Sequence, residues 1–282
     1  MTGPVLVVIG VGGMGEAIAR RLGSGRPVLV ADHSTERLEA VREQLHGNGY
    51  DVHAQQVDVS DRGSLSELAD RAAELGPITS VVHTAGLSPA QAPAHRIVDV
   101  DLVGTVHSLE VFGEVIAPGG AGIYIASVAG HILGAAVDEG TATLFATASA
   151  AEVAGAAVFT MPDVPEDYTR ALTYGYCKRG NQLRVQSAAV AWGRRGARVN
   201  CISPGVTATP MGWEEFNAEF AHQAYEAMIN DSPAGRFGTA EDVAAAAEFL
   251  LDNTKAGFIT GTDLLVDGGV VAGIRSGALQ MG

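Results

Sequence analysis

Short apolar runs alternate with longer amphipathic stretches along almost the whole chain. The apolar runs are rich in β-branched residues and nearly free of polar interruptions, as is typical of strands buried on both faces of a parallel sheet. They lie at Val5–Ile9, Val28–Ala31, Val52–Val57, Ser80–His83, Ile123–Ser127, Val199–Ile202 and Leu264–Val266. The helical stretches between them lie at Gly15–Leu22, Thr35–Leu45, Leu65–Leu75, Ile97–Ile116, Tyr174–Trp192 and Ala240–Leu251. This alternation predicts an α/β fold in which helices cover both faces of a doubly wound, seven-stranded parallel sheet, with residues 1–282 forming a single domain.

One segment interrupts this alternation of predicted strands and helices. Residues 131–170 contain no strand pattern, and their alanine-rich centre, residues 140–159, is compatible with helix. Met161–Pro165 has the composition of a turn. A segment this long without a strand is either functional or partly mobile, so we expect an insertion at about 131–170 on the substrate side of the domain.

Composition narrows the classes of partner. The net charge of −14 argues against nucleic acid and against anionic membranes as partners. No apolar stretch is long enough to span a membrane, and a strand-like run begins at Val5 where a signal peptide would lie, so we expect a cytoplasmic protein. Cys177 and Cys201 lack a metal-ligand spacing; we expect buried, reduced thiols and no metal site, with a disulfide between them less favoured.

A glycine-rich turn follows the first predicted strand and opens a helix. It comprises Gly10, Gly12, Gly13, Met14 and Gly15. Glycines at these spacings permit a tight turn and the close approach of a pyrophosphate to a helix N-terminus, so the pattern predicts a Rossmann fold that binds a dinucleotide.

Asp32 ends the second predicted strand. Its carboxylate could accept hydrogen bonds from the ribose hydroxyls of an adenosine, and it would repel a 2′-phosphate. The glycine turn carries no Lys or Arg, so we favour NAD over NADP. The alternative role for Asp32 is a helix cap, which Ser34 could equally provide. Asp58 and Val59 after the third strand, and Ala85 and Gly86 after the fourth, would continue the same ligand groove.

Tyr174 and Lys178 lie four residues apart in a predicted helix and therefore share one face. A tyrosine titrates near pH ~10, and a neighbouring cation would lower that pKa toward neutrality. By spacing alone the two residues could equally be a surface pair.

These motifs together resemble the short-chain dehydrogenases/reductases over nearly the whole length. The resemblance runs through the glycine turn, Asp58-Val59, Ala85-Gly86, Ser127 in Ile125–Gly130, Tyr174-x-x-x-Lys178, Asn200–Pro210, Gly235–Asp242 and Ile259–Gly269. The run Tyr174–Met211 is similar to the branch of 3α-hydroxysteroid dehydrogenase/carbonyl reductase.

The resemblance implies a role for each matching residue. Tyr174 would be the general acid/base, Lys178 would lower its pKa and hold the nicotinamide ribose, and Ser127 would orient the substrate oxygen. Pro204 and Gly205 would face the nicotinamide, with Thr207 and Thr209 reaching its carboxamide and the phosphates. The implied reaction is NAD(H)-dependent interconversion of a secondary alcohol and a ketone.

Three positions depart from the family pattern. The glycine turn is one residue tighter than usual, His83-Thr84 replaces an Asn pair, and Asp101 stands where the fourth catalytic residue, an Asn, normally lies. If Asp101 faces Lys178, its charge would partly cancel the effect of the lysine on Tyr174; otherwise Asp101 only shapes a helix kink.

Ser127 and Tyr174 are separated by more residues than in compact members of the family, so the extra chain must loop out over the substrate. An apolar lid would suit a hydrophobic, steroid-like or carbonyl substrate, and its candidates are Leu144, Phe145, Val153, Val158, Phe159 and Met161. The alternative is that these side chains pack on the domain or at a subunit contact.

Two classes of function fit the motifs. The first is the oxidoreductase just described, and the alternative is a catalytically weak NAD(H)-binding sensor or scaffold, motivated by His83-Thr84 and Asp101. Enoyl reduction and sugar epimerisation fit the lysine spacing and the chain length less well. By family resemblance we expect a homotetramer or homodimer, with the tail Val270–Gly282 crossing a subunit contact.

Overall fold

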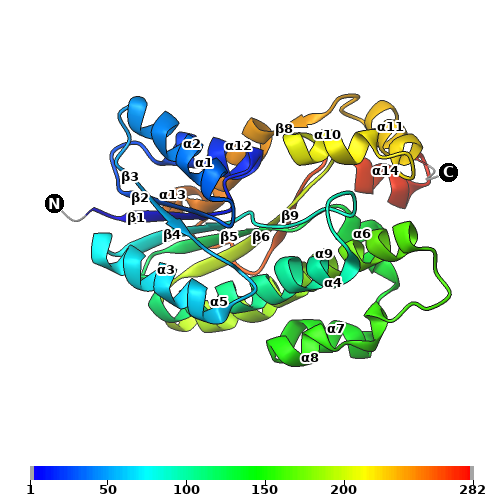
Figure 1. Cartoon of the computed structure of the whole chain (residues 1–282), viewed down its shortest axis with the longest axis horizontal. Helices are drawn as coiled ribbons and strands as arrows, with labels where there is room; N and C mark the ends of the chain where they lie inside the picture. Colours follow the sequence, from blue (N-terminus) through cyan, green and yellow to red (C-terminus); the bar gives the residue numbers. More distant parts are fainter. Residues whose placement is uncertain (1–2, 280–282) are drawn as a thin grey trace.

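The computed structural model describes residues 3–279, which pack around one sheet of seven parallel strands (Figure 1). The strands are β1 (Val5–Ile9), β2 (Val28–Asp32), β3 (Val52–Gln56), β4 (Ile78–His83), β5 (Ala121–Ile125), β6 (Arg198–Pro204) and β9 (Asp263–Val266). Their order, β3-β2-β1-β4-β5-β6-β9, reverses direction between β1 and β4. The sheet is therefore doubly wound, as predicted, and its switch point lies beyond the carboxyl ends of β1 and β4.

Helices cover both faces of the sheet (Figure 1). One layer contains α1 (Gly13–Leu22), α2 (Thr35–Gly47), α12 (Ala240–Leu251) and α13 (Asn253–Ala256), and the other contains α3 (Arg62–Leu75), α5 (Gly104–Val115) and α9 (Glu166–Arg194). Successive strand side chains point to opposite faces. Accordingly Leu6 packs with Ile18 of α1, whereas Val7 packs in the core that holds Phe112 and Trp192.

The predicted helix Ile97–Ile116 is wrong as a continuous α-helix. It consists of α4 (Ala94–Ile97), a π-helix η1 (Val98–Val103) and α5. The wider π turn carries Asp101, whose backbone carbonyl accepts a hydrogen bond from the Thr105 hydroxyl at 2.7 Å. Single π turns of this kind frequently occur at functional sites.

The segment 131–170 forms short helices that pack beneath α9. It includes the end of α6 (Ala129–Ile132), then η2 (Gly134–Ala136), α7 (Glu139–Thr147), α8 (Ala150–Ala154), η3 (Ala157–Phe159) and the start of α9, eight residues before the predicted start. Phe145 and Val153 are fully buried against Ile97 and Leu102. In Figure 1, α7 and α8 lie on the far side of α9 from α10 and α11.

A cluster of short elements closes the carboxyl end of the sheet. It contains the two-stranded sheet of β7 (Thr207–Ala208) and β8 (Gly238–Thr239), with α10 (Pro210–Asn217), α11 (His222–Asn230) and α14 (Val270–Ser276). Val270 packs against Val206, Met228 and Ile229 of the same chain. That the tail Val270–Gly282 crosses a subunit contact stays a prediction, and its residues 280–282 lie outside the described part.

Both cysteines are buried and free. Burial raises the pKa of each thiol well above its ordinary value, so neither is activated as a nucleophile. Within residues 3–279, no helix combines the length and the hydrophobicity that crossing a membrane would require.

Candidate active site

The carboxyl ends of four neighbouring strands bring the predicted site residues to one edge of the sheet. The turn after β1 carries the glycines, and Thr84–Gly86 follow β4. Ser127 follows β5, and Pro204 ends β6. Because all these strands are parallel, their carboxyl ends meet at the same edge.

The glycine turn has the shape that a bound dinucleotide needs. Gly10 has φ of +89°, and a Cβ there would lie 2.5 Å from the backbone nitrogen of Ala85. A Cβ on Gly15 would lie 1.9 Å from the Gly10 carbonyl oxygen, so the helix and turn could not close with a side chain. A Cβ on Gly12, in contrast, would meet no other atom within 4 Å, and no side chain caps α1 at this residue. The free N-terminus of α1 can therefore receive an anionic group such as a pyrophosphate.

Asp32 is held at the end of β2 by backbone amides. Its two carboxylate oxygens accept hydrogen bonds from Val11 N and Ser34 N, each at 2.9 Å. Ser34, rather than Asp32, caps α2 by accepting a bond from Arg37 N at 3.3 Å. Asp32 is therefore not required as the N-cap of α2, the alternative role considered for it.

Arg37 was missed at this end of the site. Its guanidinium lies 3.7 Å from the Asp32 carboxylate and is more than half exposed. The glycine turn itself contains no Lys or Arg, whereas Arg37 lies in the first turn of α2. A cation therefore stands beside the position that the ribose would take.

Further residues lie just after the carboxyl ends of β3 and β4. Asp58 accepts bonds from the amide and hydroxyl of Ser60 at 3.0 and 2.6 Å. Val59 is buried, and a Cβ on Gly104 would lie 2.7 Å from its Cγ2. Thr84 donates to the Gly10 carbonyl at 2.7 Å and so braces the glycine turn.

His83, the other half of the altered pair, points into the core. Its ring stacks on Tyr124 with centroids 5.3 Å apart, and within the described residues neither ring nitrogen has a hydrogen-bond partner. Burial, with a smaller effect of the Lys178 charge, lowers the pKa of His83 to about 3. It is therefore a neutral packing residue at physiological pH.

Lys178 and Asp101 form a buried ion pair. Their Nζ and Oδ2 atoms lie 2.8 Å apart, and the side chains are 6% and 0% exposed. The other Asp101 oxygen accepts a bond from Leu87 N at 2.7 Å. A Cβ on Gly86 would approach both side chains to within 3.1 and 3.2 Å, so glycine leaves them room. Burial raises the pKa of Asp101, and the lysine acts against that rise.

Tyr174 lies beside this pair, one turn earlier on α9. The Lys178 ammonium is 5.3 Å from the centre of its ring. Burial raises the pKa of Tyr174 well above its ordinary value, the charges of Glu215 and Asp101 raise it further, and a hydrogen bond with Ser127 lowers it. Burial, followed by the negative charges of Glu215 and Asp101, therefore moves this pKa in the direction opposite to the lowering expected from Lys178.

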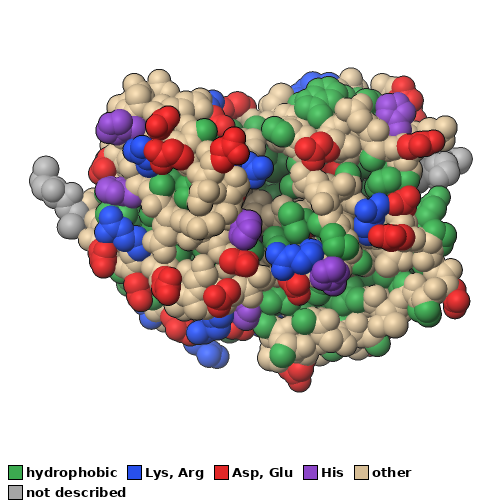
Figure 2. Space-filling view, viewed as in Figure 1, with side chains coloured by type: hydrophobic (Ala, Val, Ile, Leu, Met, Phe, Trp, Pro, Cys, Tyr) green, Lys and Arg blue, Asp and Glu red, His purple; other side chains and the backbone are tan. Residues whose placement is uncertain are grey.

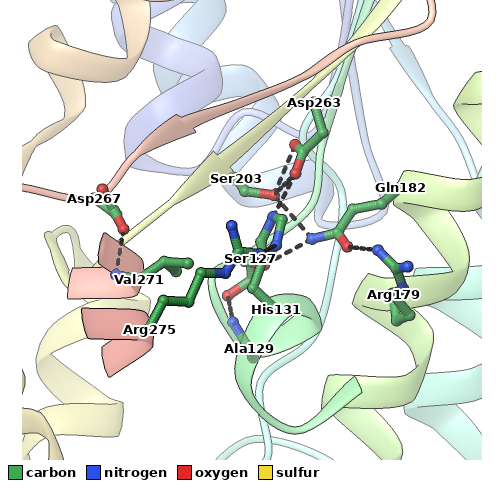
Figure 3. A network of polar contacts seen from close by, with 10 residues as sticks. All are labelled: Ser127, Ala129, His131, Arg179, Gln182, Ser203, Asp263, Asp267, Val271 and Arg275. Atoms are coloured by element: carbon green, nitrogen blue, oxygen red, sulfur yellow. Dashed lines mark hydrogen bonds and ion pairs between the residues drawn. The ribbon is translucent and has the colours of Figure 1, made fainter. Parts of the chain in front are cut away.

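A polar network fixes the strand end that carries Ser127 (Figure 3). The Gln182 amide donates to the Ser127 carbonyl at 3.2 Å and to the Ser203 hydroxyl at 3.1 Å. Ser203 in turn donates to Asp263 at 2.8 Å, and His131 contacts the same carboxylate at 2.5 Å. The Ser127 hydroxyl accepts a bond from Ala129 N at 3.1 Å, and Ser127 lines the cavity that lies beside Tyr174 and Lys178.

A cavity of about 460 Å³ opens above Ser127, Tyr174 and Lys178. Its walls also include Met14, Gly86, Asp101, Pro204, Gly205, Thr207 and Thr209. Thr209 caps α10 through Gly212 N at 3.1 Å, and its Cγ2 would lie 2.9 Å from a Cβ on Gly13. This contact joins the glycine turn to the helix that covers the cavity.

The predicted apolar lid is wrong. Among the described residues that line the cavity, none is Leu144, Phe145, Val153, Val158, Phe159 or Met161. The first five of these side chains lie in or against the hydrophobic core beneath α9, so they pack on the domain, as the alternative to a lid proposed. Met161 is not part of that core. The cavity is covered instead by α10, α11 and the loop between them, through Met211, Glu215, Phe220, Ala224, Tyr225 and Met228. Figure 2 shows this face hollowed between the two upper lobes, with hydrophobic side chains gathered near the hollow.

Glu215 was also missed. It lines the cavity, and burial raises its pKa to about 7, while a hydrogen bond with Tyr225 and the Lys178 charge act against that rise. In the sequence, Trp213-Glu-Glu-Phe216 has the pattern of a solvated helix face. The available signal was its position directly after the Pro204–Thr209 turn, which places α10 over the site.

Known proteins match this chain over nearly its whole length. Residues 4–158 match the family model described as short chain dehydrogenase, and residues 139–271 match one described as Enoyl-(Acyl carrier protein) reductase. The chain is 39% identical over 272 residues to short-chain dehydrogenase/reductase bsc3 of Alternaria brassicicola, covering 96% of this chain and 97% of that protein. It is 30% identical over 286 residues to D-threitol dehydrogenase of Mycolicibacterium smegmatis, covering 95% and 93%. The crystal structure of levodione reductase superposes with a TM-score of 0.73 at 26% identity, covering 96% of this chain and 99% of that one.

Proposed function

Because the chain belongs to the short-chain dehydrogenase/reductase family, we propose that it interconverts a secondary alcohol and a ketone with NAD(H) as the cofactor. The observation that carries the proposal is the convergence of Ser127, Tyr174 and Lys178 on one cavity beside an open glycine turn. The Gly10–Gly15 turn and Asp32 would hold the adenosine and pyrophosphate. Asp58, Val59, Ala85 and Gly86 would line the groove, and Pro204, Gly205, Thr207 and Thr209 would contact the nicotinamide end.

The protein residues supply position and a proton path. The Ser127 hydroxyl orients the substrate oxygen, and Tyr174 gives it a proton in reduction or takes one in oxidation. With its pKa raised, the Tyr174 phenol is protonated at neutral pH, the form that gives a proton in ketone reduction. The bound cofactor supplies the hydride or accepts it. The apolar side chains of Ile132, Leu133 and Met228 favour a hydrophobic substrate.

A panel of secondary alcohols with NAD+ tests the assignment through the absorbance of the reduced nicotinamide. Turnover of hydrophobic members supports it. Tight cofactor binding without turnover on a broad panel would instead support the sensor, an alternative that relatives named as dehydrogenases do not favour. The homotetramer or homodimer stays a prediction, and gel filtration with light scattering measures it.

Asp32→Ala should shift the cofactor preference toward NADP. Removing the carboxylate ends its repulsion of a 2′-phosphate and leaves Arg37 to attract one. Since juxtaposed like charges cost several kcal/mol, the ratio of kcat/KM for NADP to that for NAD should rise on the order of a hundredfold. The exposed Glu36→Ala removes the same charge from the start of α2 and should leave the ratio unchanged. An unaltered ratio in Asp32→Ala would remove the basis for preferring NAD.

Asp101→Asn should move the pH profile of alcohol oxidation to lower pH. Oxidation needs the Tyr174 phenolate, and the negative charge of Asp101 raises the pKa of that phenol. Asparagine can still accept the bond from Leu87 N but carries no charge. We expect oxidation at neutral pH to accelerate on the order of tenfold. A profile that stays in place, or moves to higher pH, would show that Asp101 does not tune Tyr174.

A further inference from the structure

Glu215 lines the cavity and has a buried carboxyl oxygen that lacks a hydrogen-bond partner in the part of the chain that the structure describes. Its Oε1 atom is buried and, within the described residues, has no hydrogen-bond partner. The carboxyl also interacts with the Tyr225 hydroxyl from α11. Burying a carboxyl oxygen without a partner is costly, so such groups in native structures call for a physical explanation.

The charged and titratable groups around Glu215 define what it can bind. They are Tyr225 on α11, Tyr174 and Lys178 on α9, Asp101 on η1 and Glu214 on its own helix. Lys178 is already paired with Asp101 at 2.8 Å, so it does not serve as the partner of Glu215. A hydrogen-bond donor for Glu215 can therefore come from a group that enters the cavity.

The cavity favours a neutral donor over a cation. A substrate ammonium would be stripped of water by walls that include Ile132, Leu133, Phe220 and Met228, and would share the cavity with the Lys178 ammonium. A hydroxyl loses far less hydration. It can also bond to a carboxyl in either protonation state, because a protonated carboxyl still has an acceptor oxygen.

We propose that Glu215 is a substrate-binding residue that accepts a hydrogen bond from a second hydroxyl group of the substrate, remote from the carbon that is oxidised or reduced. The substrate class is then a hydroxyketone or diol on an apolar carbon skeleton, held by Ser127 and Tyr174 at one end and by Glu215 and Tyr225 at the other. The inference rests on the proposed function and names the substrate class of that same site.

Matched ketone pairs test the inference: cyclohexanone with hydroxycyclohexanones, and decalone with hydroxydecalones, each assayed with NADH. The wild type should prefer at least one hydroxylated member over its parent. In Glu215→Leu that preference, the ratio of the two kcat/KM values, should fall about tenfold or more, as for the loss of a hydrogen bond to a charged group. The exposed Glu219→Gln removes the same charge from the neighbouring loop and should keep the preference.

The pH dependence separates hydrogen bonding from a purely structural effect. Because the pKa of Glu215 is about 7, the stronger acceptor, the carboxylate, forms as the pH rises through neutrality. The wild-type preference should therefore increase between about pH 6 and about pH 8. Glu215→Gln, which cannot ionise, should retain a weaker preference that is independent of pH; this variant decides the matter if Glu215→Leu does not fold.

Calorimetric titration of the same ketone pairs into the Tyr174→Phe protein with NADH gives a readout that does not need turnover. Adding Glu215→Leu should weaken binding of the hydroxyketone more than binding of its parent. An unchanged preference in turnover and binding would overturn the inference, as would a stronger preference for an aminoketone. Absence of turnover by the wild type with every ketone would instead count against the proposed function. In that case the ratio of hydroxyketone binding to parent-ketone binding would still test whether Glu215 binds the second hydroxyl.

Discussion

Tyr174→Phe should reduce turnover by about a hundredfold to ten-thousandfold, the range that a positioned general acid or base contributes. The substitution removes only the hydroxyl, the group that we propose exchanges a proton with the substrate oxygen beside Ser127. Since the ring stays, its contact with the Lys178 ammonium and the shape of the cavity persist. The measurement is kcat for ketone reduction, with NADH binding followed by calorimetry.

Tyr176→Phe is the matched control for this prediction. Tyr176 lies two residues further along α9 and packs in the core beneath the helix, away from the cavity. It should keep turnover near the wild-type level, with both variants melting near the wild-type temperature. Full activity in Tyr174→Phe would mean that another group handles the proton.

Lys178→Met should destabilise the fold by about 3–5 kcal/mol at neutral pH, because it leaves the Asp101 carboxylate buried without its partner. Burial already raises the pKa of Asp101, and loss of the lysine removes a charge that lowers it. A group whose pKa is raised on folding contributes stability at low pH that is lost as the pH rises. The deficit measured by urea unfolding should therefore shrink at acid pH and grow toward alkaline pH.

The double variant Lys178→Met/Asp101→Asn should recover most of that stability, since removing both partners of a buried pair leaves no uncompensated charge. Lys255→Met is the surface control. Its ammonium is 58% exposed and pairs with Asp252 at 3.1 Å, so the loss should stay below about 1 kcal/mol. Equal losses in Lys178→Met and Lys255→Met would contradict a buried, energetically coupled pair.

The fold follows from local pattern to an unusual degree, because strands buried on both faces leave uninterrupted apolar runs. Val5–Ile9 was predicted with its observed bounds, and the other strands differ only at their ends. The helix over Ile97–Ile116 was the exception. Its π turn carries Asp101, which pairs with Lys178 from a distant part of the chain, a contact that no local pattern encodes.

The site also combines features that local sequence predicts with features that depend on contacts between distant residues. Spacing places Tyr174 and Lys178 on one helical face, and that arrangement is observed. Their electrostatics depend on tertiary neighbours, so the pKa of Tyr174 moves opposite to the expected direction. The prediction of an apolar lid was wrong for a related reason. The apolar composition of residues 140–159 indicates that the segment is buried, but it does not indicate on which side of α9. Glu215 looked like a solvated charge because the packing of α10 over the cavity is visible only in three dimensions.

Transfer of deuterium tests the central claim most directly. An accepted secondary alcohol, labelled with deuterium on the carbon that bears the hydroxyl, is incubated with the enzyme and NAD+, and the reduced cofactor is analysed by mass spectrometry and NMR. Direct hydride transfer in the Ser127–Tyr174–Lys178 site predicts that the label appears on the nicotinamide ring, on a single face, and that Tyr174→Phe suppresses its appearance. Reduced cofactor without the label, or cofactor that binds but is never reduced by any alcohol, would contradict the account.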